Sequence, residues 1–168
     1  GASRYLHSGH YGNWAPNPAF DLARLLASMK AADGRPLIDG FYASTIPPGP
    51  AEWQAMRSVP DNDDGLRREV GLAATEMDDA PLAERLLWPS LNIRGMASAA
   101  VGEAARNVIP TEATASLDIR LVKGNDPESM LGLVEAHIRE QGFHILRSEP
   151  DLATRLAHPR IARVVRRS

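Results

Sequence analysis

The clearest alternation of apolar and polar residues in the chain lies between Ala113 and Leu121. Every odd position in this stretch is apolar, and the even positions are Thr114, Ser116, Asp118 and Arg120. A period of two is typical of a strand that buries one face and exposes the other. The pattern predicts such a strand and places Arg120 on its polar face, where an arginine is ordinarily solvated or paired with a carboxylate.

A second strand is predicted over LNIRGM, residues 91–96, which carries apolar residues at alternate positions. The two strands are joined by an irregular connection that contains Gly102 and Pro110. Together they are expected to form the centre of a sheet.

Two helices are predicted, one within residues 16–34 and one between Asp126 and Gly142. Each begins with a capping side chain followed by proline and ends at a glycine. Their apolar stripes have helical spacing and consist of Leu22, Leu25, Leu26 and Met29 in the first, and Met130, Val134, His137 and Ile138 in the second. Both helices are expected to pack on the sheet.

The remaining segments complete an α+β arrangement. Residues 1–14 are expected to form a strand ending in a glycine-rich loop, residues 43–88 a proline-punctuated helical insertion, and FHILR at 143–147 a last strand. This order predicts a ferredoxin-like, four-stranded antiparallel sheet with two helices on one face, within a domain of residues 1–150. The basic amphipathic stretch 151–168 has no evident place in it.

Composition narrows the function classes. The chain has 168 residues, a formal charge of −2 and no cysteine. The charge argues against nucleic acid and anionic membrane as partners, and the lack of cysteine rules out thiolate chemistry by this sequence. There is neither an apolar run long enough to span a bilayer nor a signal-like start, so we expect a soluble protein, in the cytoplasm.

Histidines are the main candidates for chemistry. His7 and His10 stand in the segment HSGH, but zinc generally needs three or four protein ligands, and no HExxH or His-x-Asp motif accompanies them. A solvated loop histidine is the favoured interpretation over a metal ligand. His137 lies on a buried stripe and is interpreted as a histidine at the edge of the core.

Four segments carry a family resemblance: RYLHSGHYGN, DGRPLIDGFY, WPSLNIRGM and RNVIPTEATASLDIRLVKGNDP. In order and separation they resemble the lid, or dimerisation, domain of carnosinase- and aminoacylase-type metallopeptidases, peptidase family twenty. The resemblance spans most of residues 1–150, and the insertion around 43–88 resembles that of the dipeptidase branch.

This resemblance implies the lid of a hydrolase that acts on peptide or N-acyl amino acid substrates. It implies two zinc ions held by a separate catalytic domain of the same polypeptide, no metal held by this segment, and homodimers formed through the lids. By the same resemblance, His7 stabilises the oxyanion in the partner subunit's site, Asn107 lies near the substrate, and Arg120 holds the substrate's terminal carboxylate. The outward placement of Arg120 fits the two-pronged contact that a guanidinium offers a carboxylate.

The sequence departs from the family pattern at Tyr5, Asn13 and Lys123, which bear on loop conformation and substrate choice. A second hypothesis stays open, namely a stand-alone ferredoxin-like interaction module without chemistry. We favour the excised lid because the chain starts within a predicted strand and ends in a basic stretch, which we interpret as the return into an absent catalytic domain.

Overall fold

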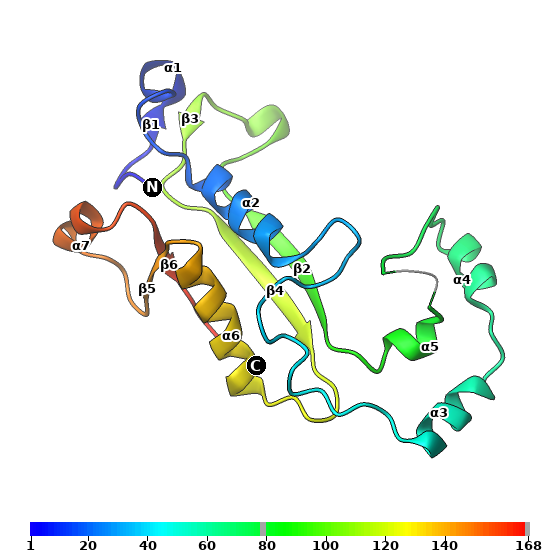
Figure 1. Ribbon diagram of the computed structural model, residues 1–168. Coiled ribbons are helices and arrows are strands. Elements are labelled where there is room, and N and C mark those ends of the chain that lie inside the picture. Colours follow the sequence, from blue (N-terminus) through cyan, green and yellow to red (C-terminus); the bar gives the residue numbers. More distant parts are fainter. Residues whose placement is uncertain (78–79, 167–168) are drawn as a thin grey trace. The chain divides into compact units, whose positions relative to one another are not determined.

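The structure, a computed structural model, describes residues 1–77 and 80–166 (Figure 1). The chain divides into two compact units. The first unit consists of Gly1–Met29, Asn92–Asp118 and Val134–Ser168, and the second of Lys30–Leu91 and Ile119–Leu133. None of the helices in the described part of the chain is long and apolar enough to cross a membrane.

Helices and short strands alternate along the chain. Elements of the first unit are β1 (Leu6–His7), α1 (Ser8–Tyr11), α2 (Pro18–Met29), η1 (Gly102–Ala104), β3 (Val108–Ile109), β5 (His144–Leu146), α7 (Leu152–Ala157) and β6 (Ile161–Arg163). Those of the second unit are α3 (Pro50–Arg57), α4 (Asp63–Glu69) and α5 (Leu82–Arg85). Three elements run from one unit into the other: β2 (Ser90–Ala97), β4 (Thr114–Arg120) and α6 (Pro127–Glu140).

The described strands pair in three two-stranded sheets: β1 with β3, β2 with β4, and β5 with β6. The first pair is antiparallel, with Leu6 opposite Ile109 and His7 opposite Val108. The last is parallel, with His144 opposite Ile161. The α+β class and the strand pair β2–β4 agree with the sequence analysis. A single four-stranded ferredoxin-like sheet is not confirmed.

The two predicted helices are confirmed as α2 and α6. Asn17 Oδ1 accepts the Ala19 amide at 2.9 Å at the start of α2, and Asp126 Oδ2 accepts the Ser129 amide at 2.8 Å at the start of α6. Most stripe residues are buried, namely Leu25, Leu26, Met29, Met130, Val134, His137 and Ile138. The periodicity of the sequence therefore identified the faces that pack.

His137 is a core histidine, as predicted. Its exposed fraction is 6%, and its Nε2 lies 2.9 Å from Ser28 Oγ. The Ser28 hydroxyl donates to the Leu25 carbonyl at 2.7 Å, so His137 Nε2 is the donor to Ser28 Oγ. This bond joins α2 to α6 within the first unit.

In the second unit the core gathers around Phe41, which is 2% exposed. Ile38 and Leu91 are buried with it, and the rings of Phe41, Tyr42 and Trp88 meet edge to face. The helices α3, α4 and α5 lie within residues 43–88, where helices were predicted, and none of them contains a buried residue.

Two local predictions need correction. Residues 8–11 form the short helix α1 rather than a loop, because the His7 side chain caps the turn. The basic tail has a defined place in the fold, contrary to the prediction. Its helix α7 is followed by β6, which pairs with β5. Leu152, Leu156 and Val165 of this tail remain exposed.

Candidate functional site

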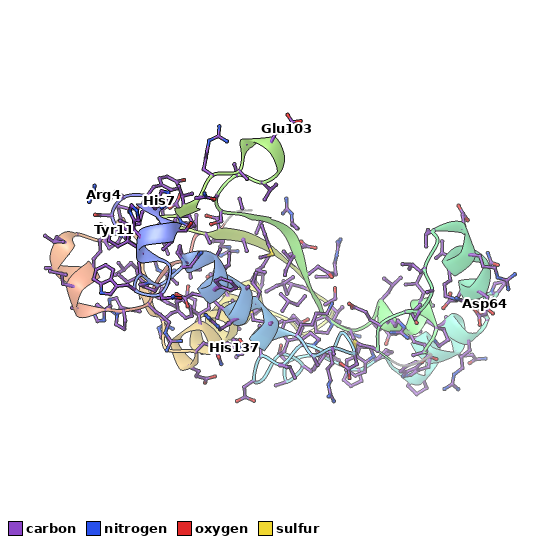
Figure 2. All side chains as sticks on the ribbon, turned by 90° about the horizontal axis from the view of Figure 1, so that it is seen from above. Arg4, His7, Tyr11, Asp64, Glu103 and His137 are labelled. Atoms are coloured by element: carbon purple, nitrogen blue, oxygen red, sulfur yellow. The ribbon has the colours of Figure 1, made fainter. Side chains whose placement is uncertain are left out.

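His7 stands at the end of β1, immediately before α1, and its side chain is exposed (Figure 2). The strand pair β1–β3 places His7 opposite Val108, and the Ser8 amide donates to the Asn107 carbonyl at 2.9 Å. The segment that carries His7 is therefore held by backbone hydrogen bonds on both sides of the residue.

One ring nitrogen of His7 is engaged by its own turn. Nδ1 accepts the Gly9 backbone N–H at 3.1 Å, and the His7 backbone is extended, with φ −70° and ψ 120°. This is the geometry of a helix N-cap, with imidazole in the place usually taken by Ser, Thr, Asp or Asn. Nε2 has no hydrogen-bond partner among the described residues and so is available to an external acceptor.

A row of aromatic rings continues from His7 along α1. The rings of His7 and His10 lie 4.7 Å apart, those of His10 and Tyr11 6.4 Å apart, and those of Tyr11 and Trp14 5.9 Å apart. Trp14 is 79% exposed. The sequence analysis did not identify this row, although HxxHYxxW repeats aromatic residues at helical spacing.

Asn107 lies directly before β3, beside the His7 segment. Its backbone carbonyl anchors Ser8, and its side chain is exposed. The predicted pair of His7 and Asn107 is thus brought together in the first unit, by the pairing of β1 and β3.

Arg120 is the last residue of β4 and belongs to the second unit. Its side chain is exposed, as are those of Thr114 and Ser116, whereas Leu117 and Ile119 are half-buried. The predicted outward placement of Arg120 is confirmed. In the described part of the chain its guanidinium has neither a hydrogen-bond nor an ion-pair partner.

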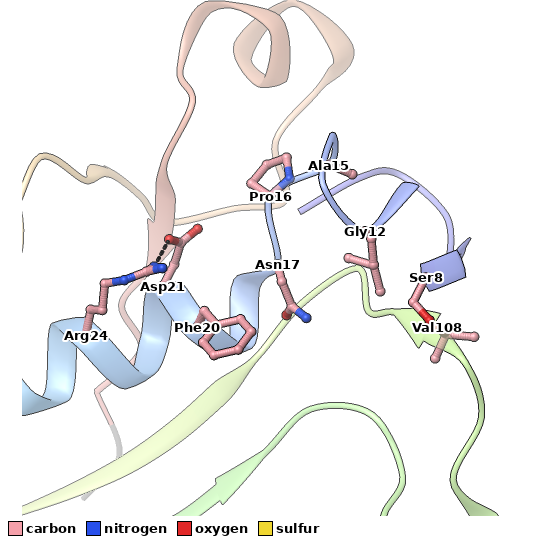
Figure 3. A pocket seen from close by; sticks show the side chains of 10 residues that line it. Ser8, Gly12, Ala15, Pro16, Asn17, Phe20, Asp21, Arg24 and Val108 are labelled. Atoms are coloured by element: carbon pink, nitrogen blue, oxygen red, sulfur yellow. Dashed lines mark hydrogen bonds and ion pairs between the residues drawn. The ribbon is translucent and has the colours of Figure 1, made fainter. Parts of the chain in front are cut away.

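A pocket of about 360 Å³ opens between the α1–α2 segment and β3 (Figure 3). Ser8, Asn17 and Val108 contribute to its wall, with Phe20, which is 65% exposed. Asp21 pairs with Arg24 at 3.1 Å on the same wall. One feature of the sequence points to this pocket, because Phe20 is a large apolar residue outside the buried stripe of α2.

Metal binding finds no support within the described residues. No group of three or more His, Cys, Asp or Glu side chains there is arranged to hold a metal ion. His7 and His10 form a pair, which is fewer than the three or four protein ligands that zinc generally needs.

Comparison with known proteins places these residues in a family. The family model described as "Peptidase dimerisation domain" matches residues 3–145. The chain is 30% identical over 160 residues to the Cys-Gly metallodipeptidase DUG1 of Saccharomyces cerevisiae, covering 94% of this chain and 33% of that protein. It is 26% identical over 137 residues to the Beta-Ala-His dipeptidase of Homo sapiens, covering 80% and 27%.

Solved structures agree in fold. The metallo-carboxypeptidase Sso-CP2 of Sulfolobus solfataricus matches with a TM-score of 0.73 at 25% identity, over 84% of this chain and 37% of that one. The di-peptidase Dug1p of Saccharomyces cerevisiae matches with a TM-score of 0.72 at 27% identity, over 84% and 30%. The chain spans about a third of the length of these relatives. With the family model covering most of its length, the chain belongs to the peptidase dimerisation domain family.

Proposed function

We propose that this chain is the lid and dimerisation domain of a metal-dependent dipeptidase or related amidohydrolase, and that it supplies contacts to a site in a separate catalytic domain. The observation that carries this proposal is an exposed His7 with an available Nε2, held on a hydrogen-bonded turn in a chain of this family. The relatives named as dipeptidases support the substrate class.

In the proposed reaction His7 acts on the amide carbonyl of the substrate. Attack of water on that carbonyl creates a tetrahedral centre whose oxygen carries negative charge. A hydrogen-bond donor held in place before the reaction stabilises that charge at little reorganisation cost. We assign this role to Nε2–H of His7, acting in the partner subunit's site.

Arg120 is assigned to the terminal carboxylate of the substrate. A guanidinium binds a carboxylate through two parallel hydrogen bonds, and its charge does not depend on pH in the working range. An arginine without a partner among the described residues, at the end of an exposed strand face, suits this task. Asn107 is assigned a position near the substrate because its exposed side chain flanks the His7 segment.

The remaining parts of the proposal lie outside this chain. Two zinc ions in the catalytic domain would supply the activated water, and dimers would form through the lids. A continuous four-stranded ferredoxin-like sheet and a cytoplasmic location also belong to the proposal rather than to the described structure.

The proposal is tested by comparing the isolated chain with the full-length protein that contains it. With zinc or manganese added, we expect the full-length protein to hydrolyse dipeptides and the purified chain of residues 1–168 to be inactive. Failure of the full-length protein to cleave any dipeptide or N-acyl amino acid would favour the stand-alone interaction module instead. Metal-dependent turnover by the pure chain would contradict the separation of lid and metal site.

A further inference from the structure

Although the His7 side chain is exposed, its ring makes two contacts with the turn that follows it. Its Nδ1 accepts the Gly9 amide at 3.1 Å, and the His10 ring lies at a centroid distance of 4.7 Å, tilted by 34°. The orientation of the ring is therefore set by the residues that follow it in sequence.

The Gly9 contact determines where the His7 proton resides. A backbone N–H only donates, so Nδ1 must present a lone pair, and a neutral imidazole then carries its proton on Nε2. We infer that the backbone amide of Gly9 fixes the tautomer of the neutral His7 ring, with its proton on Nε2, and that Gly9 and His10 are positioning residues for this donor. The catalytic meaning of this inference rests on the oxyanion role proposed above, whereas the tautomer does not.

Gly9 is suited to this task because it lacks a side chain, not because its backbone is unusual. It is not one of the glycines with positive φ in the described residues. A Cβ added there would lie 3.0 Å from His7 Cε1 and 3.1 Å from His7 Nδ1. These separations are shorter than ordinary van der Waals contacts, so a residue with a Cβ at position 9 would displace the His7 ring by about a few tenths of an ångström.

A charged His7 does not fit the same geometry. Protonation of Nδ1 would point an N–H at the N–H of Gly9 and remove the acceptor that caps α1. The Gly9 contact is therefore made by the neutral ring that carries its proton on Nε2.

His10 helps to position His7 through a contact between the two rings. The His10 ring packs against the His7 ring at a distance typical of aromatic pairs and so restricts its orientation. Phenylalanine would preserve this packing without a titratable group, whereas alanine would remove it. The two substitutions therefore separate packing from charge at position 10.

The tautomer is tested by ¹⁵N NMR of the imidazole rings in the labelled chain, above the pH at which histidines are protonated. We expect His7 to show a single Nε2–H tautomer, and Gly9→Ala to shift its ring nitrogens toward the averaged values of an unconstrained histidine. Gly132→Ala is the matched control, because a Cβ there meets nothing within 4 Å. A His7 ring that carries its proton on Nδ1, or that is unaffected by Gly9→Ala in a chain with otherwise native amide shifts, would overturn the inference.

Activity of the full-length protein tests the positioning role. Gly9→Ala should lower kcat about tenfold or more while KM changes little, because a small displacement of a catalytic donor is costly. His10→Ala should lower kcat and His10→Phe should restore it. If kcat is insensitive to Gly9→Ala although His7→Ala is damaging, the positioning role is wrong. If even His7→Ala has no effect, the proposed oxyanion role fails, while the NMR result still decides the tautomer.

Discussion

Single residues of this domain divide into donors that are available to a ligand and donors that are used within the fold. His7 Nε2 and the Arg120 guanidinium have no partner in the described part of the chain, whereas His137 donates to Ser28 and Ser28 donates to the Leu25 carbonyl. An unused donor on a hydrogen-bonded scaffold is available to a ligand, and the chemistry of each donor predicts a different kinetic effect when it is removed.

We predict that His7→Ala in the full-length protein lowers kcat about a hundredfold, with a smaller effect on KM. The reason is that an oxyanion donor acts mainly on the transition state. Steady-state kinetics with a dipeptide checks this, and His144→Ala, which alters an exposed histidine in β5, serves as the comparison. An unchanged turnover number for His7→Ala would exclude the oxyanion role.

Arg120→Lys is predicted to raise KM more than it lowers kcat, because lysine retains the charge but not the two-pronged geometry. The preference for substrates with a free carboxylate over C-terminally amidated ones should shrink at the same time. The measurement is the ratio of kcat/KM for the two substrates in both proteins. Equal ratios in the native and substituted proteins would show that Arg120 does not bind the terminal carboxylate of the substrate.

Among the elements, α6 joins its neighbours through a buried charge. Glu135 on α6 has an exposed side-chain fraction of 8% and pairs with Arg147 at 2.7 Å and with Arg139 at 3.2 Å. The hydrogen bond from Arg147 is the main cause that keeps the pKa of Glu135 below its ordinary value, aided by Arg139 and opposed by burial. This ion pair ties α6 to the segment that follows β5.

We predict that Glu135→Gln destabilises the chain by about 2 kcal/mol at neutral pH, since it breaks a buried pair whose arginines remain partly solvated. Because the folded pKa is lowered, the contribution is present above the ordinary carboxyl pKa and is lost as pH falls through the folded value. Urea denaturation at pH 7 and at acidic pH checks both points. The control is Glu140→Gln at the exposed end of α6, and a pH-independent difference between the variants would contradict the assignment.

The sequence predicted elements where the periodicity was long enough to identify a face. Helix α6 repeats its apolar residues over several turns, and β4 alternates over seven residues. No such pattern existed for α1, whose four residues depend on a cap by His7, a residue uncommon at that position. The parallel pairing of β5 with β6 is a tertiary contact that local composition does not encode. The outward placement of Arg120 could be predicted from the alternation of apolar and polar residues. The contact of Gly9 with the His7 ring could not, because it depends on side-chain geometry.

On the scale of the whole molecule, membership of a dimerisation domain family raises the question of which surface of this chain binds a second copy. Each strand of a two-stranded sheet has an edge without a strand partner, and such edges are sites where another chain can add. A symmetric dimer would bring the same surface of both copies together. Leu152 and Leu156 of α7 are exposed at 68% and 80% and offer a different, apolar route to association.

We predict that the isolated chain self-associates and that Leu152→Ser with Leu156→Ser does not abolish this. Substitution is preferable to deletion of the tail, because deletion would remove β6 from β5. Sedimentation over a range of concentrations measures the equilibrium. If both proteins are monomeric at high concentration, the lid does not carry the dimer contact, and if only the native chain associates, the contact is the exposed face of α7.

The central claim is that His7 acts across the dimer, and subunit mixing tests it most directly. One full-length variant carries His7→Ala, and the other carries an inactivated metal site in its catalytic domain, so each homodimer is inactive. After subunit exchange, the mixed dimer holds one complete site, and equal mixing should restore about a quarter of native activity by symmetry. Recovery of that activity is the result we predict. Absence of recovery, with mixed dimers demonstrated by mass spectrometry, would contradict a site built from two subunits.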